Sequence, residues 1–249
     1  MSETPEPVPS TVYRGAAYHP AMTGARDEYY NRAKQEGYRA RSAYKLKQID
    51  DDAGLLSRGD AVVDLGCAPG SWLQVAVERV DAPDAGTVVG VDLQGIESVD
   101  GATAIRGDVT EDETIERVRG ELDGPADVVV SDAAPDLSGD WNLDHSRSVH
   151  LARSALAAAE ALLRPGGDLL VKVFQGDTLE EFREELEAVF DEVWTLKPDA
   201  SRDESSEVYL LGRGLVDAPV SEGDELTVTI DDEGDEGDGV ASVDGYVLF

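Results

Sequence analysis

The residues best placed for chemistry stand where short apolar runs end. The first run, 61–65, is followed by a turn between Gly66 and Gly70. A stretch with helical periodicity begins at Trp72 directly afterwards. The glycines permit close approach of a ligand to the backbone, and Trp72 offers an aromatic wall. Because open parallel sheets bind ligands at the carboxyl ends of their strands, these residues predict a cofactor site.

Two further acids strengthen this prediction, since the turn alone is equally typical of an ordinary strand-to-helix connection. Asp92 ends the second run about 20 residues on, where an acid binds ribose hydroxyls in nucleotide-binding folds. Asp108 ends the third run and is suited to accept a hydrogen bond from an adenine amino group. The pattern Gly-x-Gly-x-x-Gly is missing, which disfavours nicotinamide and flavin cofactors.

A carboxylate and a lysine supply the reactive groups. Asp132 ends the fourth run, and the Ala-Ala-Pro that follows lacks the aromatic platform on which a flipped-out base would stack, which disfavours a base as the reacting group. Lys172 lies inside the apolar run 168–174, where a lysine is costly unless it has a partner or a function. The simpler interpretation, an aliphatic stem that extends toward water, stays open.

Alternating β-rich runs and helical stretches predict the α/β sheet that positions these groups. The predicted strands are 61–65, 87–91, 103–106, 127–131, 168–174, 192–196 and 207–212. The predicted helices are 72–80, 112–120, 144–163 and 178–190, the third followed by Arg-Pro-Gly-Gly as a stop signal. This order predicts a seven-stranded, mostly parallel sheet with helices on both faces.

The last two predicted strands lack an intervening helix, so we expect them to pair antiparallel. An antiparallel C-terminal strand separates a Rossmann-like methyltransferase sheet from an all-parallel dinucleotide fold. Together with the nucleoside-type site, it predicts S-adenosyl-L-methionine as the cofactor.

The two ends of the chain differ from this core in composition. Residues 1–28 contain four prolines and no apolar periodicity, which predicts a mobile tail. Residues 29–47 hold six of the 21 basic residues and one acid, which predicts an RNA-binding segment. Its basic residues are Arg32, Lys34, Arg39, Arg41, Lys45 and Lys47. Residues 215–249 carry 11 acids and no base, with strand-like runs at 225–230 and 246–249.

The whole composition is strongly acidic. Fifty-three acidic against 21 basic residues give a formal charge of −32, which favours a halophilic archaeal source with molar internal salt. A single cysteine, Cys67, excludes an intrachain disulfide and fits a reducing cytoplasm. No apolar run is long enough to span a membrane, so we expect a soluble cytoplasmic protein.

Five segments together resemble the FtsJ family of ribosomal RNA 2′-O-methyltransferases. They are Tyr44-Lys45-Leu46, Asp64 to Trp72, Ser131-Asp132-Ala133-Ala134-Pro135, Lys172-Val173-Phe174-Gln175-Gly176 and Ser206-Glu207-Val208-Tyr209. The resemblance implies a methyltransferase domain over residues 29–213. It implies a catalytic tetrad of Lys45, Asp132, Lys172 and Glu207. It also implies cofactor contacts from Gly70, Trp72, Asp92, Asp108 and Asp132.

The implied reaction is methylation of a ribose 2′-hydroxyl, at a uridine of 23S ribosomal RNA in the large subunit. Lys172 is the expected proton acceptor, since burial and the nearby charge of Lys45 both favour the neutral amine. As a cation it would instead stabilise the developing alkoxide. Asp132 and Glu207 would hold the two amines in register. The loop 136–142 could fold over the acceptor ribose, or its tryptophan could pack on its own helix.

Residues 215–249 resemble the beginning of a TRAM domain, a small β-barrel that assists RNA binding, and we expect an incomplete one. Two alternatives to the leading function stay open. One is 2′-O-methylation of transfer RNA or another RNA, and the other is a non-catalytic RNA-binding protein of ribosome assembly. A nicotinamide-dependent oxidoreductase is a weaker third. We predict no metal site, no membrane association and no obligate protein partner.

Overall fold

The computed structural model describes residues 25–135, 138–202, 205–216, 227–230, 232–233, 239–243 and 246–248. The chain divides into two compact units, residues 1–215 and 216–249. The predicted end of the methyltransferase domain, 213, lies two residues before this division. Most of the expected mobile tail, 1–28, lies outside the described residues, but its last four residues belong to a helix that begins at Ala25.

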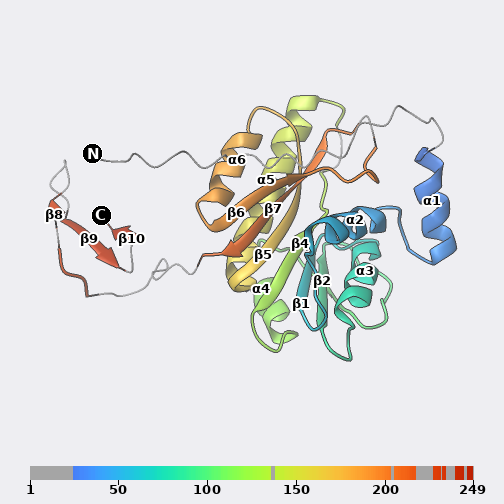
Figure 1. The fold of residues 1–249 in the computed structure, drawn as a ribbon, viewed down its shortest axis with the longest axis horizontal. Coiled ribbons are helices and arrows are strands. Elements are labelled where there is room, and N and C mark those ends of the chain that lie inside the picture. Colours follow the sequence, from blue (N-terminus) through green and yellow to red (C-terminus); the bar gives the residue numbers. More distant parts are fainter. Residues whose placement is uncertain are drawn as a thin grey trace, which may run out of the picture. The chain divides into compact units, whose positions relative to one another are not determined.

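Six helices and seven strands form the first unit (Figure 1). The helices are α1 (Ala25–Glu36), α2 (Ala43–Ala53), α3 (Ser71–Val80), α4 (Asp112–Gly120), α5 (Trp141–Leu162) and α6 (Leu179–Glu187). The strands are β1 (Ala61–Leu65), β2 (Thr87–Asp92), β3 (Thr103–Arg106), β4 (Ala126–Ser131), β5 (Leu163–Phe174), β6 (Phe190–Leu196) and β7 (Glu207–Leu215).

The seven strands form one sheet in the order β3-β2-β1-β4-β5-β7-β6. β7 pairs antiparallel with both β5 and β6, and the pairs β1–β2, β1–β4, β2–β3 and β4–β5 are parallel. The prediction of a mostly parallel sheet with an antiparallel C-terminal strand is confirmed. The strand order reverses between β1 and β4, and ligands bind at such a switch point in open α/β sheets.

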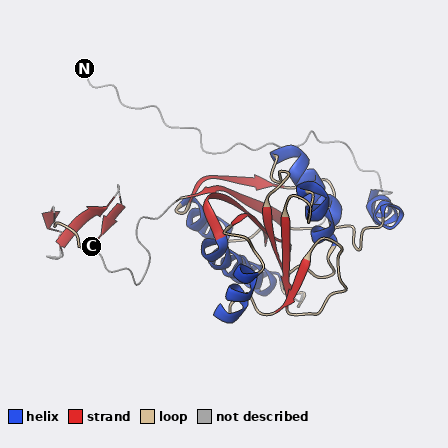
Figure 2. Ribbon diagram, turned by 90° about the horizontal axis from the view of Figure 1, so that it is seen from below, coloured by secondary structure: helices blue, strands red, loops and turns tan. Residues whose placement is uncertain are grey.

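Helices cover both faces of the sheet (Figure 2). Successive residues of β1 point to opposite faces, so Val62 packs in the cluster that contains Leu46 of α2 and Leu73 of α3. Val63 packs in the other cluster, with residues of α4, α5 and α6. Burial on both faces explains why these strands are almost continuously apolar.

The third predicted helix ends close to where it was expected, at Leu162, but the predicted start of the following strand, residue 168, is wrong. The Arg-Pro-Gly-Gly run that was expected to stop the third predicted helix lies inside β5, which begins at Leu163. Leu163 pairs with Ala126 of β4, and the register shifts before Val128 pairs with Asp168. A helix stop signal therefore coincides here with the start of a strand, because the neighbouring strand offers hydrogen-bonding partners that the local pattern does not reveal.

The second unit contains β8 (Asp232–Glu233), β9 (Gly239–Val243) and β10 (Tyr246–Leu248). β9 pairs antiparallel with both others, which confirms the C-terminal predicted strand. The described part of predicted strand 225–230 is not a strand, and no described segment pairs with it. Much of the sequence that resembles a TRAM domain lies outside the described residues, so that resemblance stays a prediction. Among the described helices, none has the length and apolarity to cross a bilayer.

Candidate active site

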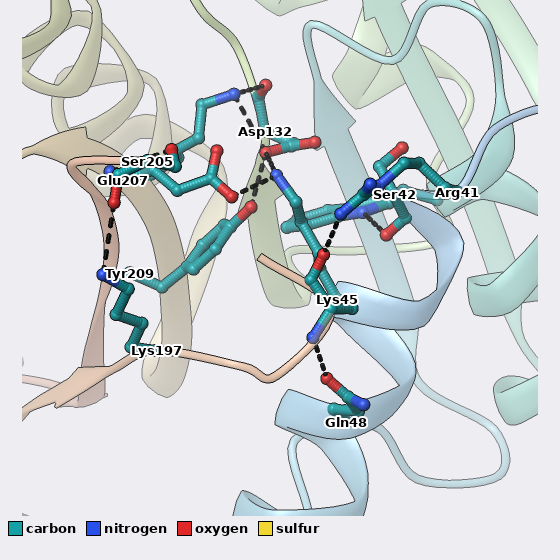
Figure 3. A network of polar contacts seen from close by, with 12 residues as sticks. Arg41, Ser42, Lys45, Gln48, Asp132, Lys197, Ser205, Glu207 and Tyr209 are labelled. Carbon is teal, nitrogen blue, oxygen red and sulfur yellow. Dashed lines mark hydrogen bonds and ion pairs between the residues drawn. The ribbon is translucent and has the colours of Figure 1, made fainter. Parts of the chain in front are cut away.

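Four charged side chains from distant parts of the first unit meet at the carboxyl edge of the sheet. Lys45 comes from α2, Asp132 follows β4, Lys172 comes from β5 and Glu207 opens β7. The Nζ atom of Lys172 lies 3.0 Å from Oδ1 of Asp132, and Nζ of Lys45 lies 2.6 Å from Oε1 of Glu207. Nζ of Lys45 lies 4.0 Å from Oδ1 of Asp132 (Figure 3). The four residues therefore form one network of two cations and two carboxylates.

Lys172 is buried and has partners, which excludes the interpretation that its stem simply extends to water. The residue is 8% exposed. Its ammonium group also donates a hydrogen bond of 2.5 Å to the backbone carbonyl of Asp132. Asp132 thus holds the amine of Lys172 through its backbone carbonyl oxygen and its carboxylate oxygen Oδ1. These two contacts fix the direction in which the remaining N–H bond or lone pair of Nζ points.

The register of β5 and β7 explains why Glu207 belongs to this network. Lys172 pairs with Tyr209, and Phe174 pairs with Glu207. Directly opposed residues of antiparallel strands project to the same face, so the alternate residues 172, 174, 207 and 209 share one face. Burial would raise the pKa of Glu207, but the charge and hydrogen bond of Lys45, with smaller contributions from Ser201 and Lys172, outweigh it and lower the pKa.

Tyr209 is a site residue that was not predicted. Its hydroxyl donates a 2.7 Å hydrogen bond to Oδ1 of Asp132, and its side chain is fully buried. Nζ of Lys45 lies 5.8 Å from its ring centroid, within the range of a cation–π interaction. Burial, and then the charges of Asp132 and Glu207, raise the pKa of Tyr209 well above its usual value. The phenol therefore stays a hydrogen-bond donor. The sequence signal that could have identified Tyr209 as a site residue is its position two residues after Glu207 in the same predicted strand.

Trp72 and Ser71 of α3 connect α2 to this site. The indole Nε1 of Trp72 donates a 2.8 Å hydrogen bond to the carbonyl of Ser42, and the hydroxyls of Ser42 and Ser71 lie 2.8 Å apart. The Trp72 ring also contacts Tyr209, with centroids 5.9 Å apart. Since Ser42 immediately precedes α2, these contacts fix the start of the helix that carries Lys45.

A cavity of about 750 Å³ lies beside the tetrad, at the switch point between β1 and β4. Its lining includes Gly66, Ala68, Asp92, Asp108 and Asp132. A Cβ atom on Gly66 would lie 2.8 Å from Cβ of Ala133, and the glycine has φ of +77°. Only glycine therefore fits the turn between these two strand ends without strain. The volume falls within the range of about 300–1,000 Å³ that is usual for cofactor sites.

Backbone groups orient the two acids predicted to hold a nucleoside. Asp92 accepts hydrogen bonds from the amides of Ala68 and Gln94, one to each carboxylate oxygen. Asp108 accepts from the amide and hydroxyl of Thr110, and these bonds lower its pKa. Asp92 keeps a free lone pair on each carboxylate oxygen, whereas Asp108 keeps its free lone pairs on Oδ2, because its Oδ1 already accepts both bonds from Thr110. These fixed acceptors at the ends of β2 and β3 are suited to the hydroxyl and amino groups of a nucleoside.

The turn from Gly66 to Gly70, here called the cofactor turn, is followed directly by α3. Gly70 and Trp72 lie at the end of this turn and are not among the residues that line the cavity. Gly70 has φ of +101° and immediately precedes α3. Trp72 is 3% exposed and faces Ser42 and Tyr209 instead. Side-chain contact of Trp72 with the cofactor has no support in this arrangement, and backbone contacts from both residues stay a prediction.

Asp64, in β1 below the same turn, has an unusual environment. It is 1% exposed, and neither carboxylate oxygen has a hydrogen-bond partner. Burial raises its pKa well above the usual value, and the charges of Asp132 and Asp92 raise it further. An unpaired buried carboxylate is costly, so Asp64 favours the protonated form in the protein as described.

Five of the six basic residues of segment 29–47, all except Lys34, have partners described within the protein. Arg39 donates to the carbonyls of Pro69, Glu97 and Ser98 at 2.6–3.0 Å. Arg41 donates to the carbonyl of Ala200, and Lys47 to the hydroxyl of Tyr38. Arg32 pairs with Glu36 and stacks on Tyr44. These contacts assign structural work to Arg39 and Arg41, and RNA contacts by the segment, including exposed Lys34, stay a prediction.

Comparison with known proteins places the sequence among methyltransferases. The family model described as FtsJ-like methyltransferase matches residues 38–215. That interval contains the tetrad, the cofactor turn and all seven strands of the main sheet.

Individual relatives agree with the family match. The chain is 58% identical over 224 residues to Ribosomal RNA large subunit methyltransferase E of Natronomonas pharaonis, covering 90% of this chain and 88% of the relative. It is 58% identical over 231 residues to the protein of the same name from Halorubrum lacusprofundi, covering 92% and 85%. A crystal structure of a Plasmodium falciparum ribosomal RNA methyltransferase superposes with a TM-score of 0.65 at 28% identity, covering 72% of this chain and 99% of that one.

Proposed function

The chain belongs to the FtsJ-like methyltransferase family, and from that membership we propose that it methylates a ribose 2′-oxygen, at a uridine, in 23S ribosomal RNA of the large subunit. S-Adenosyl-L-methionine is the proposed methyl donor, and the cytoplasm is the proposed site of action. The relatives' names support ribosomal RNA as the substrate. The proposal that the methyl acceptor is a hydroxyl rests on the tetrad of Lys45, Asp132, Lys172 and Glu207.

The cavity at the switch point fits the proposed cofactor. Asp92, Asp108 and Asp132 would hold it through their free lone pairs, and the bare backbone at Gly66 would leave it room. When bound, S-adenosylmethionine supplies an electrophilic methyl group on a positively charged sulfur. The adjacent tetrad then has two tasks, which are to place the hydroxyl oxygen in line with that methyl group and to remove the hydroxyl proton.

Lys172 is the proposed proton acceptor. An uncharged amine has two N–H groups and one lone pair, and the two oxygens of Asp132 are sufficient to accept both N–H groups. The lone pair would then be free to accept the proton from the 2′-hydroxyl as the oxygen–methyl bond forms and the sulfur–methyl bond breaks, with its electron pair left on sulfur. The proton ends on Nζ, where the Asp132 carboxylate stabilises the resulting ammonium.

The other charged residues position and tune this pair. Lys45 is held by Glu207 at 2.6 Å, and it brings a second positive charge near the Asp132–Lys172 pair. Tyr209 fixes the orientation of the Asp132 carboxylate through its 2.7 Å hydrogen bond.

Substitution of Lys172 tests this function and separates the two roles that a lysine could have. Lys172→Ala removes the proposed base, so methyl transfer to unmethylated ribosomal RNA should fall by about 10²-fold or more, measured with radiolabelled S-adenosylmethionine at high salt. Lys172→Arg keeps the positive charge but cannot accept a proton at neutral pH. It should be equally inactive if Lys172 is a base, and it should keep substantial activity if the charge alone stabilises the alkoxide.

Calorimetric binding of S-adenosylmethionine to both variants is the control for folding. Mapping of 2′-O-methyl groups on ribosomal RNA and on transfer RNA from cells with and without the gene identifies the substrate. A missing methyl group on 23S RNA supports the proposal, whereas a change confined to transfer RNA would favour the first alternative. Full activity of Lys172→Ala would refute the assignment of the base.

A further inference from the structure

A second cavity, which shares no lining residue with the first, is lined in part by close sequence neighbours of the tetrad. It has a volume of about 380 Å³, and its lining includes Trp141, Phe174, Arg202 and Ser206. Phe174 shares a face of β5 with Lys172, two residues away, and Ser206 immediately precedes Glu207. The cavity therefore opens next to the atoms that would receive the acceptor hydroxyl. Its volume is in the range of about 300–1,000 Å³ typical of small-molecule sites.

Trp141 presents an aromatic surface at this cavity. It is the first residue of α5 and is 57% exposed, so most of its ring faces solvent instead of packing against α5 or the core. The position is nevertheless fixed, because the Asp140 side chain caps the helix by accepting hydrogen bonds from the amides of Asn142 and Leu143. The cap fixes the backbone that carries Trp141, and a solvent-facing indole at such a position is suited to stacking against a planar ligand.

Arg202 supplies an unused positive charge to the same cavity. Its guanidinium makes no hydrogen bond or ion pair with the described residues, whereas Arg32, Arg39, Arg41 and nine further arginines have such partners among them. The loop that carries it is anchored, since Ala200 accepts from Arg41 and donates to Gln48, and Lys197 donates to the carbonyl of Ser205. A chain with a net charge of −32 has few cations to spare, so an unpaired one beside the site calls for an anionic partner.

The acidic residue among the described residues that line this cavity, Asp144, is already engaged. Its carboxylate accepts hydrogen bonds from the amides of Ser138 and Gly139 and from the Ser138 hydroxyl. These bonds lower its pKa, and they fix the loop before Trp141. Its charge is directed into the loop rather than toward Arg202.

We propose that this cavity binds the nucleotide whose ribose is methylated, with Trp141 stacking on its base and Arg202 pairing with an adjacent phosphate. The inference rests on the proposed function and adds the substrate contacts that the tetrad alone does not supply. It requires a single-stranded or unpaired acceptor nucleotide, because a base inside a duplex is not free to stack on a side chain. Base stacking on Trp141 positions the ribose, and the methyl group still goes to oxygen at the tetrad.

Kinetics of surface variants with unmethylated ribosomal RNA test the proposal. Trp141→Ala should raise KM for RNA about tenfold or more, the effect of losing one base–aromatic stack, while Trp141→Phe should keep most of the affinity. Arg202→Gln should raise KM for RNA and weaken the dependence of binding on salt concentration. Affinity for S-adenosylmethionine should be unchanged in all three variants.

Two matched controls separate these effects from general surface changes. Leu143→Ala removes an exposed apolar side chain from the same helix end, and Arg58→Gln removes an exposed arginine remote from the site. Neither should change KM for RNA. An RNA with an abasic ribose at the methylated position sharpens the test. The wild-type protein should bind this RNA more weakly than the intact RNA, whereas Trp141→Ala should bind the two RNAs with nearly the same affinity.

Failure of this inference is distinguishable from failure of the proposed function. An active wild-type enzyme whose KM for RNA is the same as that of Trp141→Ala and Arg202→Gln would overturn the cavity assignment alone. An equal loss on abasic RNA in wild type and Trp141→Ala would overturn the stacking. A wild-type protein that binds S-adenosylmethionine but transfers no methyl group to any RNA would overturn the proposed function, and this assignment with it.

Discussion

At the scale of single residues, Arg39 shows how a motif that predicts one role can have another. Its position in a basic segment predicts RNA binding, but its guanidinium reaches three backbone carbonyls, of Pro69 in the cofactor turn and of Glu97 and Ser98 after β2. Its backbone amide also donates to Gln74 of α3. Arg39 therefore joins the two loops that flank the cofactor cavity, which makes it a positioning residue for that site.

Substitution of Arg39 should therefore weaken cofactor binding. Arg39→Gln removes a charged donor shared by three carbonyls, and bonds to charged groups contribute about 1.5–3 kcal/mol. We expect the Kd for S-adenosylmethionine, measured by calorimetry, to rise about tenfold. The exposed Arg58→Gln is the control. Normal cofactor affinity combined with weaker RNA binding would instead support a direct RNA contact for Arg39.

The buried Asp64 should make stability depend on pH in the direction opposite to that of a salt-bridged acid. Its pKa is raised well above the value of about 3.9 for an unfolded chain. The protonated form is favoured in the fold, so the contribution of Asp64 to stability is fully present below its unfolded-state pKa of about 3.9 and is lost as pH rises toward the folded-state pKa. This loss is a consequence of burying an unpaired charge.

Asp64→Asn removes this titration, so the variant should gain on wild type as pH rises. We expect the difference in the free energy of unfolding between the two cofactor-free proteins to grow by about 1–3 kcal/mol between about pH 5 and pH 8. Urea unfolding in high salt at both values measures it. A difference that does not change with pH would mean that Asp64 has partners that hold its charge.

At the scale of elements, the end of β5 depends on packing against the start of α5. His145 is buried, and its Nδ1 lies 2.9 Å from the carbonyl of Phe174 while Nε2 accepts from the amide and hydroxyl of Thr178. These bonds select the tautomer with the proton on Nδ1. The ring also lies directly against Gly176, which explains why a glycine follows Lys-Val-Phe-Gln in this motif.

Gly176→Ala should therefore destabilise the protein. A Cβ atom at this position would lie 2.5 Å from His145 ring atoms, and the ring cannot move without breaking bonds to Phe174 or Thr178. Overpacking of this kind costs about 1–3 kcal/mol, which should lower the melting temperature by several degrees. Activity should fall as well, because Phe174 and Lys172 share this strand.

Gly120→Ala is the matched control. Gly120 ends α4 and has no atom within 4 Å of an added Cβ, so alanine there should leave stability unchanged or slightly improved. Equal melting temperatures for Gly176→Ala and wild type would show that the end of β5 can shift without cost.

At the scale of the whole molecule, the net charge of −32 makes the stability of the fold depend on salt concentration. Relatives from Natronomonas pharaonis and Halorubrum lacusprofundi agree with the halophilic origin that the composition predicts. The Debye length falls from about 10 Å at 0.1 M salt to about 3 Å at 1 M. Repulsion among distant carboxylates is then screened, and the short-range contacts that would bind an RNA phosphate remain.

The melting temperature should therefore rise steeply with potassium chloride between about 0.1 M and 1 M, by calorimetry or circular dichroism. Sucrose, which favours compact states without screening charge, is the control and should have a smaller effect. A melting temperature that is flat or falls with salt would show that ion pairs, such as Arg153 with Glu181, contribute more than the excess negative charge.

The order and type of the elements could be predicted from the sequence, because periodicity reports which side of a strand or helix is buried. The predicted bounds of β1, β3 and α4 agree with the structure. The Lys-Val-Phe-Gln-Gly and Ser-Glu-Val-Tyr segments identified two members of the tetrad through resemblance to a family. The direction of β7 followed from a connection that contains no helix.

Other features depended on the tertiary structure, because they arise where residues far apart in the sequence meet. The hydroxyl of Tyr209 reaches Asp132 only because β5 lies between β4 and β7. Arg39 meets Pro69 only because α2 packs on α3, and β5 begins at Leu163 only because β4 offers it partners. The second cavity is likewise built from the start of α5 and the loop before β7. Local patterns specify what each element is, whereas the packing of the sheet decides which side chains can act together.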